Sequence, residues 1–249
     1  MQFYKHNFIG DDLNNCTVEW VISDTLEIYK THLKNPTLHD WYYRDKKIDY
    51  FFNSTGHRSN DVAAVDLDNY IVTTGCSNTV GVGLELEKTY SYLLSNKLNC
   101  DYYNLGLGAS GIDLVVHNLI IWLNVVKKQP KAIVIQWPDY TRCAVIKGIN
   151  SNIITRGIWN RDPNTEAFLV NGIDINFFYS RKVFAERLLK TIVSCPIINF
   201  NIGDQTPFSN ENNIQGNVID FARDLMHPGI ESNKQFAETL YAEIDSRIR

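Results

Sequence analysis

The sequence predicts an α/β fold: a flavodoxin-like three-layer α/β/α sandwich around a mainly parallel five-stranded sheet. From about residue 68 onward, short runs rich in β-branched residues alternate with longer segments of helical period, a pattern typical of βαβ units. The chain has 249 residues, of which 44% are hydrophobic and 21% charged, enough for one domain with a full core. We expect this domain over 68–249, with an aromatic-rich extension over 1–67 packed on it.

The first half of the expected domain contains two strands and two helices. A β-branched run at 70–74 predicts the first strand, and apolar residues of helical spacing predict a helix over 84–98. A short second strand is expected at 101–104. The clearest helix follows it, because apolar residues recur at helical spacing in Ile112, Val115, Val116, Leu119, Ile120 and Leu123.

The second half continues the alternation. Strands are expected at 132–136 and 197–201, joined by a helix over about 179–193. The inner face of that helix is expected to carry Phe184, Leu188 and Ile192. A short fifth strand at 218–221 and a final helix complete the domain. The long connection at about 142–175 predicts a lid-like insertion, because connections of this length usually carry function.

This alternation also predicts where a ligand binds. Right-handed crossovers and a strand order of 2-1-3-4-5 place the carboxyl ends of the strands on one edge of the sheet. Open α/β sheets bind their ligands at that edge. Ser77, Ala109 and Asp139 each follow an expected strand and are therefore expected there.

Two short motifs at opposite ends of this pattern supply the groups for nucleophilic catalysis. Gly75-Cys76-Ser77-Asn78-Thr79 follows the first strand, and Asp224-Leu225-Met226-His227-Pro228 precedes the last helix. A serine hydroxyl must lose its proton as it attacks, so it needs a nearby imidazole. A carboxylate then fixes the tautomer of that imidazole. The residue types predict Ser77 as nucleophile, His227 as base and Asp224 as the orienting acid.

Cys76 is a second nucleophile to consider, because a thiolate is more reactive than a hydroxyl. Adjacent residues at a strand end point to opposite sides. If Ser77 faces the site, Cys76 faces the core.

A glycine-rich loop, Asn104-Leu105-Gly106-Leu107-Gly108-Ala109-Ser110-Gly111, follows the second strand. Such a loop can offer backbone N–H groups to a developing oxyanion.

Taken together in this order, the three blocks resemble those of the SGNH/GDSL hydrolase family, in its Gly-Cys-Ser variant, over roughly residues 53–248. The resemblance implies acyl transfer through Ser77, His227 and Asp224, and a backbone donor at Ala109, with Gly108 as the alternative. It implies no metal or organic cofactor. The segment Asn53–Ser59 is similar to one found in some Gly-Cys-Ser members, and is expected to buttress the site.

The third block departs from the family pattern. Where the family places Gly-x-Asn-Asp, this chain has Gln136-Trp137-Pro138-Asp139. An ionised carboxylate in the slot of the Asn amide would repel the oxyanion that the amide stabilises. The candidates for a replacement donor are Arg142, Gln136 and Asn78. Arg142 is of particular interest because a guanidinium can pair with Asp139 or hold an anionic substrate.

The predicted function is therefore that of a serine esterase acting on small esters, such as O-acetyl groups on glycans. One alternative keeps the triad but passes the acyl group to a sugar hydroxyl, as an O-acyltransferase. Another is a binding or structural module, for example of a virion, in which the altered third block marks lost catalysis.

Composition argues against several partners. A net charge of −4 and the absence of long Lys/Arg runs disfavour nucleic acid. Apolar stretches fall short of the ~20 residues that a membrane span needs. The 5 cysteines form no C-x-x-C pair and are expected to be free thiols. The start of the chain lacks an apolar h-region, which predicts a cytoplasmic protein, and its richness in Asn and Ile suggests a phage or marine bacterial source.

Overall fold

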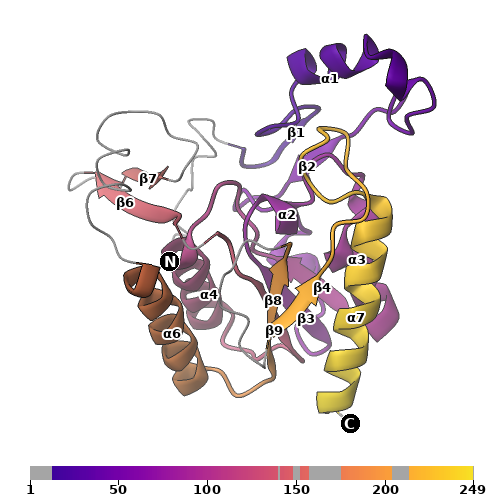
Figure 1. Cartoon of the computed structure of the whole chain (residues 1–249). Helices are drawn as coiled ribbons and strands as arrows, with labels where there is room; N and C mark the ends of the chain where they lie inside the picture. Colours follow the sequence, from indigo (N-terminus) through magenta and orange to yellow (C-terminus); the bar gives the residue numbers. More distant parts are fainter. Residues whose placement is uncertain (1–12, 140, 148–151, 157–174, 204–212, 249) are drawn as a thin grey trace.

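The computed structural model describes residues 13–139, 141–147, 152–156, 175–203 and 213–248 (Figure 1). Much of the predicted insertion at 142–175 lies outside the described residues. Its described part includes an antiparallel pair of strands, β6 (Cys143–Lys147) and β7 (Asn152–Arg156).

The central sheet contains five parallel strands. These are β3 (Tyr70–Thr74), β4 (Asp101–Asn104), β5 (Ile133–Gln136), β8 (Ile197–Ile202) and β9 (Asn213–Gly216), in the spatial order β4-β3-β5-β8-β9. This arrangement confirms the predicted fold class and the order 2-1-3-4-5.

Helices cover both faces of this sheet (Figure 1). On one face lie α4 (Ile112–Val126) and α6 (Ile175–Ile192), and on the other lie α3 (Tyr90–Leu98) and α7 (Ile230–Ile248). Successive strand residues point to opposite faces, so each face has its own core. The first core includes Tyr70, Val72, Leu119, Trp122, Ile133 and Leu189. The second includes Ile71, Leu94, Val134, Phe200, Phe236 and Leu240.

The fifth strand differs from the prediction. It was expected at 218–221, but the strand is Asn213–Gly216, paired with β8. A side chain at Gly216 would lie 2.7 Å from the ring of Phe236 and 2.8 Å from that of Phe200. Glycine thus lets this edge strand approach two buried rings. Ile219 is exposed and lies in the loop beyond the strand.

The helix predicted over 84–98 is divided. A short 3-10 helix, η3 (Leu86–Lys88), precedes α3, and Thr89 between them has extended backbone, with φ −73 and ψ 145. The hydroxyl of Thr89 accepts the N–H of Tyr92, which caps α3 and starts it at Tyr90.

The inner face of α6 also differs from the prediction. Phe184, Leu188 and Ile192 are exposed, and the side chains buried against the sheet are instead Lys182, Ala185 and Leu189. Lys182 tolerates this place because it pairs with Glu186 at 2.5 Å and lies over the ring of Trp137.

The N-terminal segment lies above the carboxyl ends of the strands (Figure 1). Its strands β1 (Cys16–Val18) and β2 (Tyr50–Phe52) pair antiparallel, and between them come α1 (Leu26–Leu33) and the 3-10 helix η1 (Pro36–Leu38). A further 3-10 helix, η2 (Val62–Ala64), leads to the sheet. The segment shares a third core with the loops below it, formed by Val21, Tyr43, Ile48, Tyr50, Phe52, Val80, Val82, Leu84 and Ala222.

No helix in the described part of the chain is both long enough and apolar enough to span a membrane.

Candidate active site

Ser77 lies where β3 turns into a single helical turn, α2 (Ser77–Val80). Glycine is required before it, because a Cβ at Gly75 would lie 2.3 Å from Oγ1 of Thr79 and 2.8 Å from Gln136. The helix ends at Gly81, whose φ of 76 is left-handed. This tight turn places Ser77, which is 7% exposed, at the carboxyl edge of the sheet.

His227 and Asp224 come from the loop that precedes α7. Nε2 of His227 is 2.7 Å from Oγ of Ser77, and Nδ1 is 2.6 Å from Oδ2 of Asp224. The structure therefore brings together the three residues that the sequence motifs single out. With the Asp224 carboxylate as acceptor, the hydrogen-bond network assigns the proton to Nδ1 and leaves Nε2 to face the serine.

The backbone of the same loop orients the carboxylate. Oδ1 of Asp224 accepts the N–H groups of Met226 and His227, each at 3.0 Å. Leu225 between them has a φ of 54, in the left-handed region. That conformation is uncommon for a residue with a Cβ, and here it closes the turn around the acid.

The environment of Asp224 keeps it ionised. Burial raises the pKa of this carboxyl, but the hydrogen bond and charge of His227, together with the hydroxyl of Ser23, outweigh burial and lower the pKa to about 2. A carboxylate with such a low pKa stays negative at neutral pH, in contact with Nδ1 of His227.

Cys76 points away from the triad. It is buried, and its S–H donates to Oε1 of Gln136 at 3.1 Å. The same oxygen accepts the backbone N–H of Cys76 at 3.1 Å, while Nε2 of Gln136 donates to the carbonyl of Trp137. The amide of Gln136 is thus engaged in holding the nucleophile turn.

The glycine-rich loop after β4 is fastened to the nucleophile turn. Nδ2 of Asn104 donates to the carbonyl of Thr79 at 2.7 Å, and the carbonyl of Gly75 accepts from Leu107 N–H and Ser110 Oγ–H. Ala109 adopts the left-handed region with a φ of 58.

Three backbone N–H groups where the Ser77 turn meets the glycine-rich loop are available to a ligand. Within the described residues, the N–H groups of Ser77, Gly108 and Ala109 have no hydrogen-bond acceptor. They are the groups that a developing oxyanion could engage.

The carboxylate of Asp139, in the altered third block, bonds within its own turn. Oδ1 of Asp139 accepts the N–H of Thr141 at 2.8 Å and its hydroxyl at 2.5 Å. A Cβ at Gly111 would lie 2.6 Å from the carbonyl oxygen of Arg142, so the backbone of Arg142 abuts the end of the glycine-rich loop. In the described part of the chain, Ser77 and His227 form no hydrogen bond with the side chains of Asn78, Asp139 or Arg142.

Arg58 is a supporting residue whose role the sequence reading did not identify. Its buried guanidinium donates to the carbonyls of Val80, Gly81 and Leu84 at 3.1, 2.7 and 2.8 Å, and lies over the ring of Tyr50. The carbonyls of Val80 and Gly81 end α2, where a cation is favourable. The only sequence signal was its place in the segment Asn53–Ser59.

Ser23 is a second residue at the site that the sequence motifs did not indicate. Its hydroxyl donates to Oδ2 of Asp224 at 2.6 Å.

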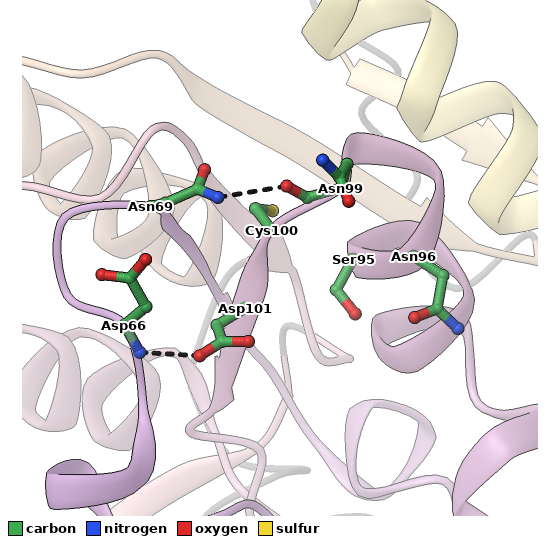
Figure 2. Close-up of a pocket in the computed structure, with 7 residues that line it drawn as sticks. All are labelled: Asp66, Asn69, Ser95, Asn96, Asn99, Cys100 and Asp101. Carbon is green, nitrogen blue, oxygen red and sulfur yellow. Dashed lines mark hydrogen bonds between the residues drawn. The ribbon is translucent and has the colours of Figure 1, made fainter.

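A hollow of about 360 Å³ lies at the opposite edge of the sheet, by the amino ends of β3 and β4 (Figure 2). It is lined by Asp66, Asn69, Ser95, Asn96, Asn99, Cys100 and Asp101. Its polar groups bond to one another: Nδ2 of Asn69 donates to the carbonyl of Asn99, and Asp101 accepts the N–H of Asp66. Among the described residues, no group of three or more His, Cys, Asp or Glu is arranged to hold a metal ion.

Comparison with known proteins gives only distant structural similarity. No protein-family model and no curated sequence matches the chain. A carbohydrate esterase family 2 enzyme with a carbohydrate-binding domain, from Corynascus thermopiles (Myceliophthora fergusii), has a TM-score of 0.46 at 16% identity, over 72% of this chain and 66% of that one. An acetyl xylan esterase from the rumen bacterium Butyrivibrio proteoclasticus has a TM-score of 0.47 at 14% identity, over 72% and 64%.

A member of the lipolytic protein G-D-S-L family from Veillonella parvula has a TM-score of 0.44 at 13% identity, over 72% of this chain and 98% of that one. The chain spans about two thirds of the length of the first two structures, 66% and 64%. At these TM-scores the similarity carries no argument about chemistry, which rests on the residues of the site.

Proposed function

We propose that the chain is a serine ester hydrolase of the SGNH type, in its Gly-Cys-Ser variant. The observation that carries the proposal is the continuous chain of hydrogen bonds from Ser77 through His227 to Asp224, with distances of 2.7 and 2.6 Å. A serine hydroxyl bonded to an imidazole that a buried carboxylate orients is the arrangement that activates serine in acyl transfer.

In the proposed reaction, Oγ of Ser77 bonds to the ester carbonyl carbon while Nε2 of His227 takes its proton. The carbonyl oxygen becomes an oxyanion, which the N–H groups of Ser77 and Ala109, or of Gly108 in its place, would stabilise. Asp224 stabilises the imidazolium. The imidazolium then gives its proton to the leaving alcohol, and water releases the acyl group from Ser77 with His227 as base.

The proposed substrate is a small ester, such as an O-acetyl group on a glycan. This part of the proposal rests on the resemblance of the sequence blocks to the SGNH/GDSL family. Transfer of the acyl group to a sugar hydroxyl uses the same three residues, so product analysis with a sugar acceptor distinguishes an O-acyltransferase from a hydrolase.

The test compares two neighbouring nucleophiles. We expect a fluorophosphonate probe to label the folded wild-type protein, and the protein to hydrolyse p-nitrophenyl acetate. Ser77→Ala should abolish both activities, whereas Cys76→Ala, the matched control one residue away, should retain most of both because its thiol faces the core. Labelling that survives Ser77→Ala and disappears with Cys76→Ala would transfer the role to the thiol. Absence of labelling in folded wild-type protein would support a non-catalytic module.

A further inference from the structure

We propose that Ser23, in the N-terminal segment, is a positioning residue of the active site, whose hydroxyl holds the carboxylate that orients His227. This inference rests on the proposed function, and it adds a fourth member to the hydrogen-bonded chain from a part of the sequence outside the family blocks.

The geometry at Asp224 supports this role. Oγ of Ser23 donates to Oδ2 of Asp224 at 2.6 Å, the same oxygen that meets Nδ1 of His227 at 2.6 Å. The other oxygen, Oδ1, is held by two backbone N–H groups of its own loop. Each carboxylate oxygen therefore has a fixed donor besides the imidazole, and the plane of the carboxylate cannot rotate without breaking one of these bonds.

The turn that carries Ser23 is strained. Val21 and Asp24 exchange two backbone hydrogen bonds, at 3.0 and 2.9 Å, across a two-residue turn. Ile22 in that turn has a φ of 55, which is a true outlier for a β-branched residue. Such strain persists only where the surroundings fix it, and it concentrates at functional sites. Here it directs the following residue, Ser23, toward Asp224.

A buried ion pair sets the register between the two segments. Asp24, which follows Ser23, accepts from Nε and Nη2 of Arg223, which precedes Asp224, at 2.9 and 2.7 Å. Both side chains are 1% exposed. The guanidinium lies 4.2 Å from the ring of Trp20, and Tyr50 donates its hydroxyl to Asp24. Ser23 is thereby held opposite Asp224 by its immediate neighbours.

The hydroxyl also moderates the charge that His227 faces. The groups around this carboxylate are His227 and Arg223 on its own loop and, from the N-terminal segment, Ser23, Tyr43 and Asp24, which pairs with Arg223. Burial raises the pKa of Tyr43, so this phenol stays neutral. Without the Ser23 donor, Oδ2 presents its full charge to Nδ1, which favours the protonated imidazole. The acidic limb of the activity profile should then move to higher pH.

The experiment compares Ser23→Ala, Ser23→Thr and a matched control, Thr31→Ala, which removes a hydroxyl on the exposed side of the same segment. The pH dependence of kcat/KM is measured on p-nitrophenyl acetate. We expect Ser23→Ala to lower kcat about 10-fold at unchanged KM, and to move the acidic limb upward by roughly half a pH unit, as loss of a hydrogen bond to a charged group implies. Ser23→Thr should recover most of both, and Thr31→Ala should match the wild type.

A substrate-free measurement separates this inference from the proposed function. The proton between Nδ1 of His227 and Asp224 lies in a short charge-assisted hydrogen bond, which gives a low-field proton NMR signal. We expect Ser23→Ala to shift this signal and Thr31→Ala to leave it in place. If the wild type hydrolyses no ester, the proposed function fails while the signal still tests Ser23. A wild-type signal and pH profile in Ser23→Ala, or no recovery in folded Ser23→Thr, would overturn the inference.

Discussion

The two loops that meet at the candidate site differ in how far the sheet itself holds them in place. The turn that carries Ser77 is fixed by residues of the sheet itself: Gln136 of β5 bonds to Cys76, and Asn104 of β4 bonds to Thr79. The loop that carries Asp224 and His227 is held from the N-terminal segment, with Ser23 lying 201 positions away in sequence. The turn that carries Ser77 is therefore bonded to the sheet as well as to Arg58 of the N-terminal segment. The carboxylate of Asp224, in contrast, takes Ser23 of the N-terminal segment as a side-chain donor.

The two loops should therefore respond differently to substitutions. A change at Ser23 or Asp24 can alter the loop of Asp224 and His227 while the bonds between the sheet and the Ser77 turn stay intact. A change at Gly75 or Gln136 would disturb both, because those residues are packed within the sheet edge. Variants placed on each side can test whether the two loops are independent in this way.

The largest effect is expected from His227→Gln, which removes the base and leaves the loop in place. Without an imidazole, no group takes the serine proton, and kcat should fall by roughly 10⁴-fold or more, as for removal of a triad member. A thermal unfolding scan should still show a cooperative transition, since the side chain of His227 is partly exposed and a glutamine amide can donate to Asp224 in its place. Turnover measured on p-nitrophenyl acetate at wild-type level would remove His227 from the mechanism.

The next effect concerns the anchor of the acid–base loop. Asp24→Ala leaves the Arg223 guanidinium buried without its carboxylate, and should lower the free energy of unfolding by about 3–5 kcal/mol. Lys234→Ala is the control: it breaks a pair with Glu231 whose side chains are 51% and 59% exposed, and should cost at most about 1 kcal/mol. Urea unfolding measures both.

Activity measurements on the same two variants extend the comparison. Where Asp24→Ala remains folded, we expect its kcat to be lower than that of Lys234→Ala, because the register of Ser23 against Asp224 depends on the buried pair. Equal turnover in the two variants would show that the loop keeps its shape without the Asp24–Arg223 pair, and the position of Ser23 would not depend on that pair.

The position of Ser77 at the sheet edge could be predicted from the sequence, but the anchors Ser23 and Asp24 could not, for physical reasons. Hydrophobic period and strand-to-helix turns are local signals, so the sheet order and the placement of Ser77 follow from short stretches of chain. The partners Ser23 and Asp24 reach Asp224 and Arg223 only after the chain has folded. No local pattern marks such long-range bonds. The resemblance of Asp224 and His227 to a family block pointed to this loop, but not to the residues that hold it.

The errors within the core have a similar origin. In α6 the apolar residues form two stripes, and spacing alone does not tell which faces the sheet. The buried stripe includes Lys182, which sequence rules place outside, and only its contacts with Glu186 and Trp137 make that position acceptable. In β9 the sequence Asn213-Ile214-Gln215-Gly216 is polar, because it forms an edge strand. The strand was predicted at 218–221 instead because those residues are more apolar.

A smaller effect is expected from the pH dependence of stability. The pKa of Asp224 is lowered from 3.8 to about 2 in the folded chain. A carboxyl with a depressed folded pKa stabilises the fold above its unfolded pKa, and this contribution is lost as pH falls through the folded value. The free energy of unfolding of the wild type, relative to that of Asp224→Asn, should therefore fall by about 2 kcal/mol as the pH is lowered from about 5 to about 2.

The control for this measurement is Asp45→Asn, the same change at an exposed carboxyl of the N-terminal segment. Urea unfolding at a series of pH values should show a nearly constant difference between this control and the wild type. A difference between wild type and Asp224→Asn that is equally constant would mean that the bonds of Ser23 and His227 do not stabilise the ionised form.

The smallest effect is expected from Asp139→Asn, which tests the altered third block. Neither of the two loops supplies this part of the candidate site. Asp139 uses Oδ1 to accept from Thr141, and Asn in its place keeps that acceptor while replacing the other oxygen with a donor. If Asp139 lies in the slot of the family amide, its charge opposes the oxyanion. We therefore expect Asp139→Asn to raise kcat by ~10-fold, on the scale of a weak oxyanion-hole donor.

The Arg142→Ala variant shows how a change in kcat of Asp139→Asn is to be interpreted. If Asp139 instead holds Arg142 over the site, Asp139→Asn would release the guanidinium, and both variants would lower kcat on the same small ester. A gain in Asp139→Asn with little change in Arg142→Ala supports an oxyanion hole weakened by a misplaced charge. A loss in both supports an arginine-based site, in which the third block has exchanged an amide for a cation. Wild-type kcat in both variants would place these residues away from the chemistry and leave the oxyanion to the backbone donors of Ser77 and Ala109.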